Sequence, residues 1–255
     1  MRLNTKNLAL AGVFAALYSV FTVVPIFPIL GASSGARIAL ASIAAPLIGL
    51  ILGPFTGTLA VSIGGLLGWA FQPQSGAFSF LSFLPGAVSA FSSGLLFKRK
   101  RAPLFALYLS LFSILAFYPN VGPMWLYPYF LWFQLIGLLL LASPLTSAAM
   151  DFTHEKTKPW RLGLGVGIIF LVSILVGQIA GTVLYESMYV PTTGLWEMLT
   201  YTYPVERGLM ALIATIIGTP VIEAVRAYGF EIGGIKKNAT RSNPDQTSKA
   251  EQRLG

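Results

Sequence analysis

The side chains that usually carry out catalysis are scarce in this sequence. It has no cysteine and one histidine, His154, which excludes thiol chemistry, thiolate-bound metals and multi-histidine metal centres. It contains neither a Walker-type phosphate loop nor a His-Glu-x-x-His helix. Glu186, Glu197 and Glu206 remain as candidate acids or bases of a membrane enzyme, but no metal ligands or paired carboxylates cluster with them in the sequence. We therefore predict a protein that is not an enzyme and that holds no metal or cofactor.

A second set of residues has the polar and aromatic chemistry needed to hold a small organic ligand. These candidate ligand-binding residues are Arg37, Gln72, Gln74, Trp125, Trp196 and Tyr201. The arginine suits a carboxylate or phosphate, although it could equally form a structural ion pair with Glu206. The glutamines can donate and accept hydrogen bonds, and the aromatic side chains can stack on a ring of the ligand. The competing interpretation is an aromatic belt at the membrane interface together with hydrated loop residues.

The composition places these residues in a membrane protein. Hydrophobic residues make up 55% of the 255 residues and charged residues 10%, whereas soluble domains carry about 25% charged residues. Such a chain cannot supply the polar surface of a soluble fold. We predict an all-α membrane domain over residues 1–228. Residues 229–255 are polar and lack apolar periodicity, which predicts a disordered, basic cytoplasmic tail.

Eight apolar segments reach or approach the length of about 20 residues that crosses a bilayer. The predicted spans are Leu8–Leu30, Ala36–Leu52, Pro54–Phe71, Phe80–Phe97, Pro103–Tyr118, Pro128–Met150, Leu162–Tyr185 and Pro204–Tyr228. A Gly53-Pro54 break separates the second span from the third, because glycine ends a helix and proline starts one. The first apolar run exceeds the apolar part of a signal peptide, about 7–15 residues, so we predict that it is retained. The fold prediction is a polytopic bundle of about eight transmembrane helices.

The basic residues predict the orientation of this bundle, because lysine and arginine accumulate in cytoplasmic loops. With a cytoplasmic N-terminus and eight crossings, all 17 Lys and Arg residues except Arg37 and Arg207 fall on the cytoplasmic side. Membrane topology therefore explains the net charge of +8 better than nucleic-acid binding does. We expect a multi-pass protein of the cell membrane with both termini in the cytoplasm.

A series of small-residue motifs runs along the chain in a particular order. The first predicted helix carries an Ala-x-x-x-Ala pattern at Ala11 and Ala15. The later motifs are the Gly31–Gly35 loop, the Gly53-Pro54 break, the glycines within 57–68, Phe83–Gly86, Gly94–Lys98, Gly177-Gln178-x-x-Gly181, Pro204–Arg207 and Ile217–Pro220. Together they resemble the substrate-binding S components of energy-coupling factor (ECF) transporters over about residues 8–98 and 162–228. The segment Pro103–Met150 departs from the resemblance, because the family has six helices and this segment adds two.

The resemblance implies a high-affinity binder of a vitamin or similar micronutrient that is captured outside the cell. It also implies partners, namely a transmembrane coupling protein and two cytoplasmic ATPases. In that family the small-residue face of the first helix docks on the coupling protein. On this chain the docking residues would be Ala11, Gly12, Ala15 and Ala16. The competing role of this strip is packing within the chain itself.

The leading hypothesis is thus a micronutrient-binding subunit. Its pocket is expected to open outward between the loops Gly31–Arg37 and Gln72–Ser79 and the outer ends of spans five to eight. The alternative is a stand-alone transporter or channel for a small solute, which would give flux from this chain alone. The centres of the predicted spans contain no ionisable residues, which disfavours ion coupling but leaves facilitated diffusion open.

Overall fold

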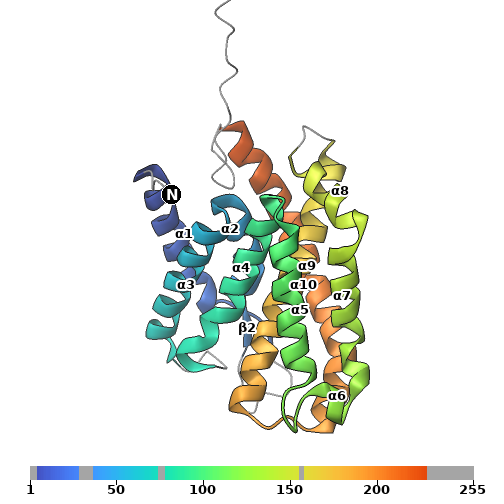
Figure 1. Ribbon diagram of the computed structural model, residues 1–255. Coiled ribbons are helices and arrows are strands. Elements are labelled where there is room, and N and C mark those ends of the chain that lie inside the picture. Colours follow the sequence, from blue (N-terminus) through green and yellow to red (C-terminus); the bar gives the residue numbers. More distant parts are fainter. Residues whose placement is uncertain (1–4, 29–36, 74–77, 155–157, 229–255) are drawn as a thin grey trace, which may run out of the picture.

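The computed structural model describes residues 5–28, 37–73, 78–154 and 158–228. Apart from a two-stranded hairpin, the regular elements of these residues are helices (Figure 1), so the all-α prediction is confirmed. The elements are α1 (Thr5–Val23), β1 (Pro25–Pro28), β2 (Arg37–Ala39), α2 (Ala41–Leu52), α3 (Pro54–Phe71), η2 (Ser79–Phe83), α4 (Leu84–Phe97), α5 (Arg101–Ala116), α6 (Pro123–Leu126), η3 (Pro128–Leu131), α7 (Trp132–Ala142), α8 (Pro144–Phe152), α9 (Pro159–Met188) and α10 (Thr193–Ala227).

The first two predicted spans are shorter than the sequence indicated. Helix α1 ends at Val23, and Pro25–Pro28 forms β1 instead of further helical turns. Proline lacks an N–H and clashes with the preceding turn, so the prolines of this segment stop the helix. Strand β1 pairs antiparallel with β2, and α2 begins only at Ala41. The predicted boundaries Leu8–Leu30 and Ala36–Leu52 are therefore wrong on the side of the hairpin.

The predicted break between α2 and α3 is confirmed, and it is closely packed. Gly53 has a φ of 84°, a backbone conformation that residues with a side chain rarely adopt, and Pro54 is the first residue of α3. Gly94 of α4 lies against this joint. A β-carbon built at that position would be 2.4 Å from the Pro54 nitrogen. Helix α4 approaches the joint so closely only because residue 94 is glycine.

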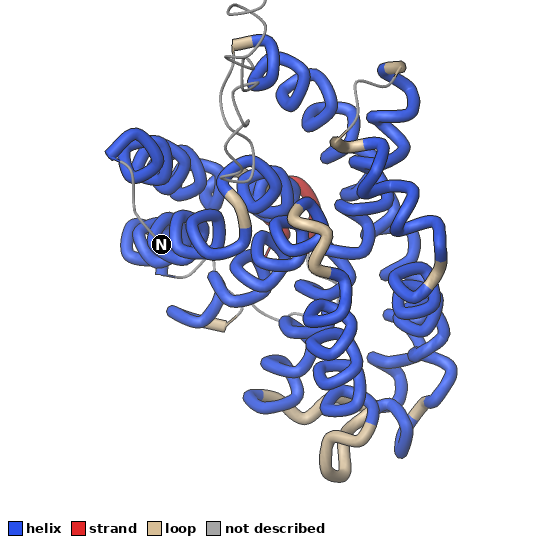
Figure 2. Tube along the Cα trace, turned by 45° about the horizontal axis from the view of Figure 1, so that its top comes forward, coloured by secondary structure: helices blue, strands red, loops and turns tan. Residues whose placement is uncertain are grey.

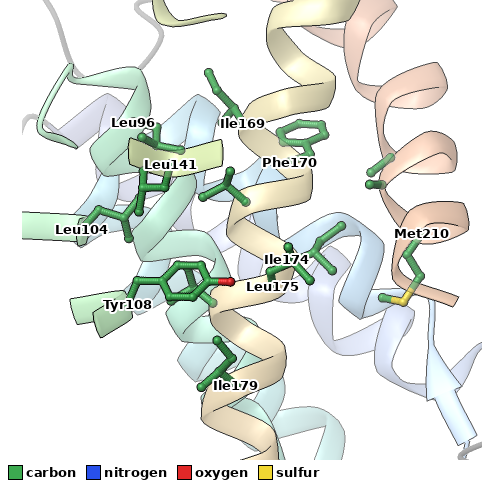
Figure 3. Close-up of a cluster of buried hydrophobic side chains, with 14 of the residues drawn as sticks. Leu96, Leu104, Tyr108, Leu141, Ile169, Phe170, Ile174, Leu175, Ile179 and Met210 are labelled. Carbon is green, nitrogen blue, oxygen red and sulfur yellow. The ribbon is translucent and has the colours of Figure 1, made fainter. Parts of the chain in front are cut away.

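Helix α9 is central to the bundle. It contacts α4, α5, α7, α8 and α10, and Figure 3 shows its side chains between those of α4 and α5 on one side and Met210 of α10 on the other. The fully buried side chains around it include Leu96, Leu104, Tyr108, Leu141, Ile169, Phe170, Leu175 and Ile179. Helices α1, α2, α3 and α4 pack on one another beside this cluster, and the strands lie among the helices (Figure 2).

The predicted sixth span is broken near its middle. Helix α7 ends at Ala142 and α8 begins at Pro144, and the two helices are bent by 63°. Because Pro144 has no N–H, it cannot donate to the Leu140 carbonyl one turn earlier. The hydroxyls of Ser143 and Thr146 donate to that carbonyl instead, each at 2.7 Å. These hydroxyls, together with the Ser143 backbone N–H at 3.2 Å, satisfy the carbonyl at the break.

Helix α10 is longer than the predicted eighth span, because it begins at Thr193 rather than at Pro204. Pro204 lies inside the helix and frees the Thr200 carbonyl four residues earlier. The indole of Trp132 donates a hydrogen bond to this carbonyl at 3.3 Å. The extension places Glu206 and Arg207 in the interior of the helix, and not at its start as the predicted span Pro204–Tyr228 implied.

Four helical segments are long and apolar enough to cross a membrane: α3, η2 with α4, α9 and α10. The bent pair formed by η3, α7 and α8 would be a fifth, and the apolar helices α1, α2 and α5 are shorter. In the part of the chain that the structure describes, these helices indicate a multi-pass membrane protein with four to five spans by length and composition. The expected total of eight spans stays a prediction.

Basic residues gather at the end of the bundle where α4 turns into α5 and where α8 and α10 end (Figure 1). Arg101 donates to the Ser147 hydroxyl at 2.9 Å and to the Ala142 carbonyl beside the α7–α8 break. Arg99 forms an ion pair with Asp151 at 2.7 Å. These contacts tie the α4–α5 turn to α8 and group the charges at one end of the molecule.

Candidate ligand-binding site

A cavity of about 230 Å³ lies where α1, α3 and α4 meet α9 and α10. Its described walls come from α1, α3, α4, α9 and α10, together with β2, the start of α2 and η2. Aromatic side chains form much of the lining: Tyr18, Trp69, Phe78, Phe83, Tyr185, Trp196 and Tyr203. The volume is below the roughly 300–1,000 Å³ of drug-sized sites, so the cavity suits a small ligand with a flat ring.

Glycines make room for the aromatic wall. A β-carbon built on Gly86 of α4 would be 2.2 Å from the hydroxyl oxygen of Tyr18. A β-carbon built on Gly65 of α3 would be 2.5 Å from the β-carbon of Phe83. Both distances are far below van der Waals contact, so a side chain at either glycine would displace a ring of the wall.

Several polar side chains of the wall have no hydrogen-bond partner among the described residues. Gln178 of α9 is 6% exposed, and neither atom of its amide is bonded. The Ser89 hydroxyl of α4 and the Trp69 indole N–H of α3 are likewise buried without a partner. Native proteins pair nearly all buried polar groups with protein or water. These three groups therefore point to a molecule that the cavity receives.

A charged pair on α10 completes the wall. The Glu206 and Arg207 side chains are 10% and 14% exposed, and their closest nitrogen and oxygen are 3.8 Å apart. The Arg207 guanidinium lies 5.1 Å from the centre of the Tyr203 ring and contacts the Met210 sulfur at 3.4 Å. Glu206 Oε1 and Arg207 Nε are buried without a hydrogen-bond partner in the described part of the chain. The pair offers a ligand both signs of charge.

One of the predicted ligand-binding residues, Trp196, lines the cavity. It is fully buried, its indole N–H donates to the Val121 carbonyl at 3.0 Å, and its ring lies 4.7 Å from that of Phe130. Because the N–H is already bonded, Trp196 can offer a ligand only its ring.

The other predicted ligand-binding residues are not brought to this cavity by the structure. Trp125 is 61% exposed and Tyr201 70% exposed, and Gln72 is exposed at the end of α3. None of the three contributes to the described lining. Gln74 and the side chain of Arg37 lie outside the described residues, although β2 lines the cavity next to Arg37. The outer ends of α5 and α7, expected to form part of the pocket, do not line it either.

The four predicted docking residues divide between the two faces of α1. Ala11 and Ala15 are 7% and 5% exposed, and a β-carbon built on Gly64 of α3 would be 2.4 Å from the Ala15 carbonyl oxygen. Ala11 and Ala15 therefore lie on the buried side of α1. Gly12 and Ala16 are exposed, and only they are free to meet a partner.

Sequence reasoning missed Gln178, Ser89 and Trp69 as members of the site. Each lies inside an apolar helix, and the sequence does not show that α3, α4 and α9 bring them to the same cavity. Gln178 carried a usable signal, since an amide in a long apolar helix is costly unless something pairs with it. Glu206 and Arg207 were not among the predicted ligand-binding residues either. The predicted span placed them at the start of a helix, whereas α10 begins at Thr193.

The described residues contain no group of three or more His, Asp or Glu side chains that could hold a metal ion. No family model, no curated protein and no solved structure matches this chain.

Proposed function

We propose that this chain is the membrane-embedded substrate-binding subunit of an ECF-type importer, which captures a vitamin or similar micronutrient outside the cell. One observation carries the proposal: a cavity within an apolar helical bundle is lined by buried polar groups, above all Gln178, that have no partner among the residues the structure describes. Such groups cost free energy until they are hydrogen-bonded. A ligand that pairs with them regains that cost, which favours tight and selective binding.

Uptake by such a subunit depends on partners, because the sequence has no phosphate-binding loop of its own. A coupling membrane protein and two cytoplasmic ATPases would supply the energy. The exposed Gly12 and Ala16 on α1 support a docking role, because small side chains allow helices in lipid to approach closely.

Eight spans with both termini in the cytoplasm belong to the same proposal. The α4–α5 turn, the end of α8 and the end of α10 lie at one end of the bundle (Figure 1). An even number of crossings between these points produces that arrangement. The basic residues at this end support its cytoplasmic assignment, since such residues accumulate in cytoplasmic loops.

The test begins with the ligand. Native mass spectrometry of the protein purified in mild detergent should detect one small molecule bound to the chain. The recovered molecule is then offered to proteoliposomes that contain the chain alone or the chain with a coupling protein and ATPases. We expect uptake only in the second case and only with ATP.

Two results would contradict the proposal. Flux of the recovered molecule through the chain alone would favour the stand-alone transporter or channel. A protein that carries no small molecule, and that no vitamin stabilises in a thermal-shift screen, would remove the binding role.

A further inference from the structure

We infer that the cavity binds an uncharged, flat ring compound that presents an amide-like edge, with a hydrogen-bond donor and an acceptor side by side. This inference rests on the proposed function, because it assigns a ligand class to the same cavity. Lactams, carboxamides and pyrimidine-type rings have such an edge.

Gln178 specifies the edge. Its amide offers two donor hydrogens and one acceptor oxygen. Both ends are buried at the cavity wall, and neither has a partner in the part of the chain that the structure describes. A ligand with only acceptors, such as a carboxylate, would leave the amide oxygen of Gln178 unpaired. A ligand with only donors would leave the amide nitrogen unpaired. An amide-like edge pairs with both atoms at once.

Other residues of the cavity wall also offer both kinds of hydrogen bond. The Trp69 N–H is a donor that has no partner among the described residues. Ser42 also lines the cavity, and its carbonyl lacks the usual helical donor because Pro46 in α2 has no N–H. The Ser89 hydroxyl can donate or accept. This mixture fits a heterocycle with polar atoms of both kinds around its rim.

The charges of the described lining favour a neutral ligand. Glu206 and Arg207 are its charged residues, and they are paired with each other at 3.8 Å. An anion would gain from the guanidinium but would be repelled by the adjacent carboxylate, and a cation would meet the reverse. The two charges compensate each other inside a low-dielectric bundle. A charged ligand would therefore lose its hydration in the cavity without meeting an uncompensated charge of the opposite sign.

The shape of the ligand follows from the wall. Rings of α1, α3, α9 and α10 surround a cavity of about 230 Å³, and aromatic side chains pack well against flat π-systems. Trp196 provides a ring whose N–H is already bonded to Val121. It therefore contributes packing and no polar selectivity, which leaves Gln178 to read the ligand edge.

The test compares neutral probes with derivatives that lack N–H donors or carry a negative charge. Uracil and nicotinamide carry the neutral amide-like edge. In 1,3-dimethyluracil the N–H donors of uracil are methylated, orotate adds a carboxylate to uracil, and nicotinate has a carboxylate in place of the amide of nicotinamide. Binding to the full-length protein in detergent is measured by calorimetry and thermal shift. We expect uracil or nicotinamide to bind at least about tenfold more tightly than its altered counterparts, because a lost buried hydrogen bond costs about 1.4 kcal/mol or more.

The matched variants are Gln178→Met and Gln134→Met. Gln134 of α7 is 0% exposed, and both atoms of its amide also lack a partner among residues 5–28, 37–73, 78–154 and 158–228, but it does not line the cavity. Each substitution replaces an unpaired buried amide by an apolar side chain of similar length, so neither should lower the melting temperature. We expect Gln178→Met to weaken probe binding at least about tenfold and Gln134→Met to leave it unchanged.

Three results would overturn the ligand class. They are probe binding that survives Gln178→Met, failure of both neutral probes to bind, and a preference for orotate or nicotinate that Arg37→Ala removes. In the last case, or if mass spectrometry recovers a charged molecule, the proposed binding and uptake function would stand while the neutral class fails.

Discussion

At the scale of single residues, burial alone does not mark a binding group. Gln178 and Gln134 are both buried amides whose atoms lack partners in the described structure. Gln134 packs near α5, where the Tyr108 hydroxyl donates to its backbone carbonyl at 2.8 Å. Of the two, only Gln178 is among the described residues that line the 230 Å³ cavity. An unpaired buried amide costs free energy at either position, but only beside a cavity can a ligand recover that cost by hydrogen bonding to it.

Gly86 offers a second test at this scale. In Gly86→Ala the new β-carbon falls 2.2 Å from the Tyr18 hydroxyl oxygen, so the Tyr18 ring must move within the cavity wall. We expect the affinity for the co-purified molecule to fall by about tenfold or more. The free energy of unfolding should decrease by about 1–3 kcal/mol, which is the usual cost of overpacking a core.

The matched control for Gly86 is Gly208 of α10, where a built β-carbon meets no atom within 4 Å. Gly208→Ala should retain affinity and gain up to about 1 kcal/mol of stability, because alanine is the better helix former. Equal affinities in the two variants, measured by calorimetry, would show that the Tyr18 ring does not shape the site.

At the scale of elements, α1 has two faces with different tasks. The face with Ala11 and Ala15 is buried, and the tight approach at Gly64 fixes α1 on α3. The face with Gly12 and Ala16 is exposed. Bulky substitutions on the first face would therefore test folding, and only the second face can test docking.

The double variant Gly12→Leu with Ala16→Leu isolates the docking face. A β-carbon at Gly12 meets no atom within 4 Å, so the fold should tolerate the change. We expect ligand binding to be retained while ATP-dependent uptake in proteoliposomes is lost, because the added side chains keep a partner helix at a distance. The control is Val20→Leu on α1, where the residue is already large and 60% exposed. Normal uptake by the double variant would contradict docking on this face.

At the scale of the whole molecule, the direction of the bundle across the membrane is directly measurable. The chain has no cysteine, so single cysteines can be introduced without background labelling. Lys100→Cys lies in the α4–α5 turn and Val190→Cys in the α9–α10 loop, where Val190 is 80% exposed. We expect an impermeant maleimide to label position 190 in intact cells and position 100 only after lysis. Labelling of both positions, or of position 100 alone, would refute the proposed orientation.

The architecture was predictable from the sequence where the cause is local. The break at Gly53-Pro54 could be predicted because glycine and proline restrict or free the backbone at their own positions, whatever packs around them. The α7–α8 break also follows from a proline, but the apolar run around Pro144 concealed it. Gln178, Trp69 and Ser89 line the same cavity because of the way in which α3, α4 and α9 pack. The small and apolar residues of these helices do not specify that packing in a single sequence.

None of the described lining residues comes from Arg101–Phe152. This segment supports the lining through two groups. The Val121 carbonyl accepts from the Trp196 indole, and the Phe130 ring contacts the rings of Trp196 and Tyr203. In evolutionary terms, exposed side chains of Arg101–Phe152 can change to suit a new lipid or a new neighbour without replacing any described residue of the lining. The lining can in turn change without altering those exposed side chains.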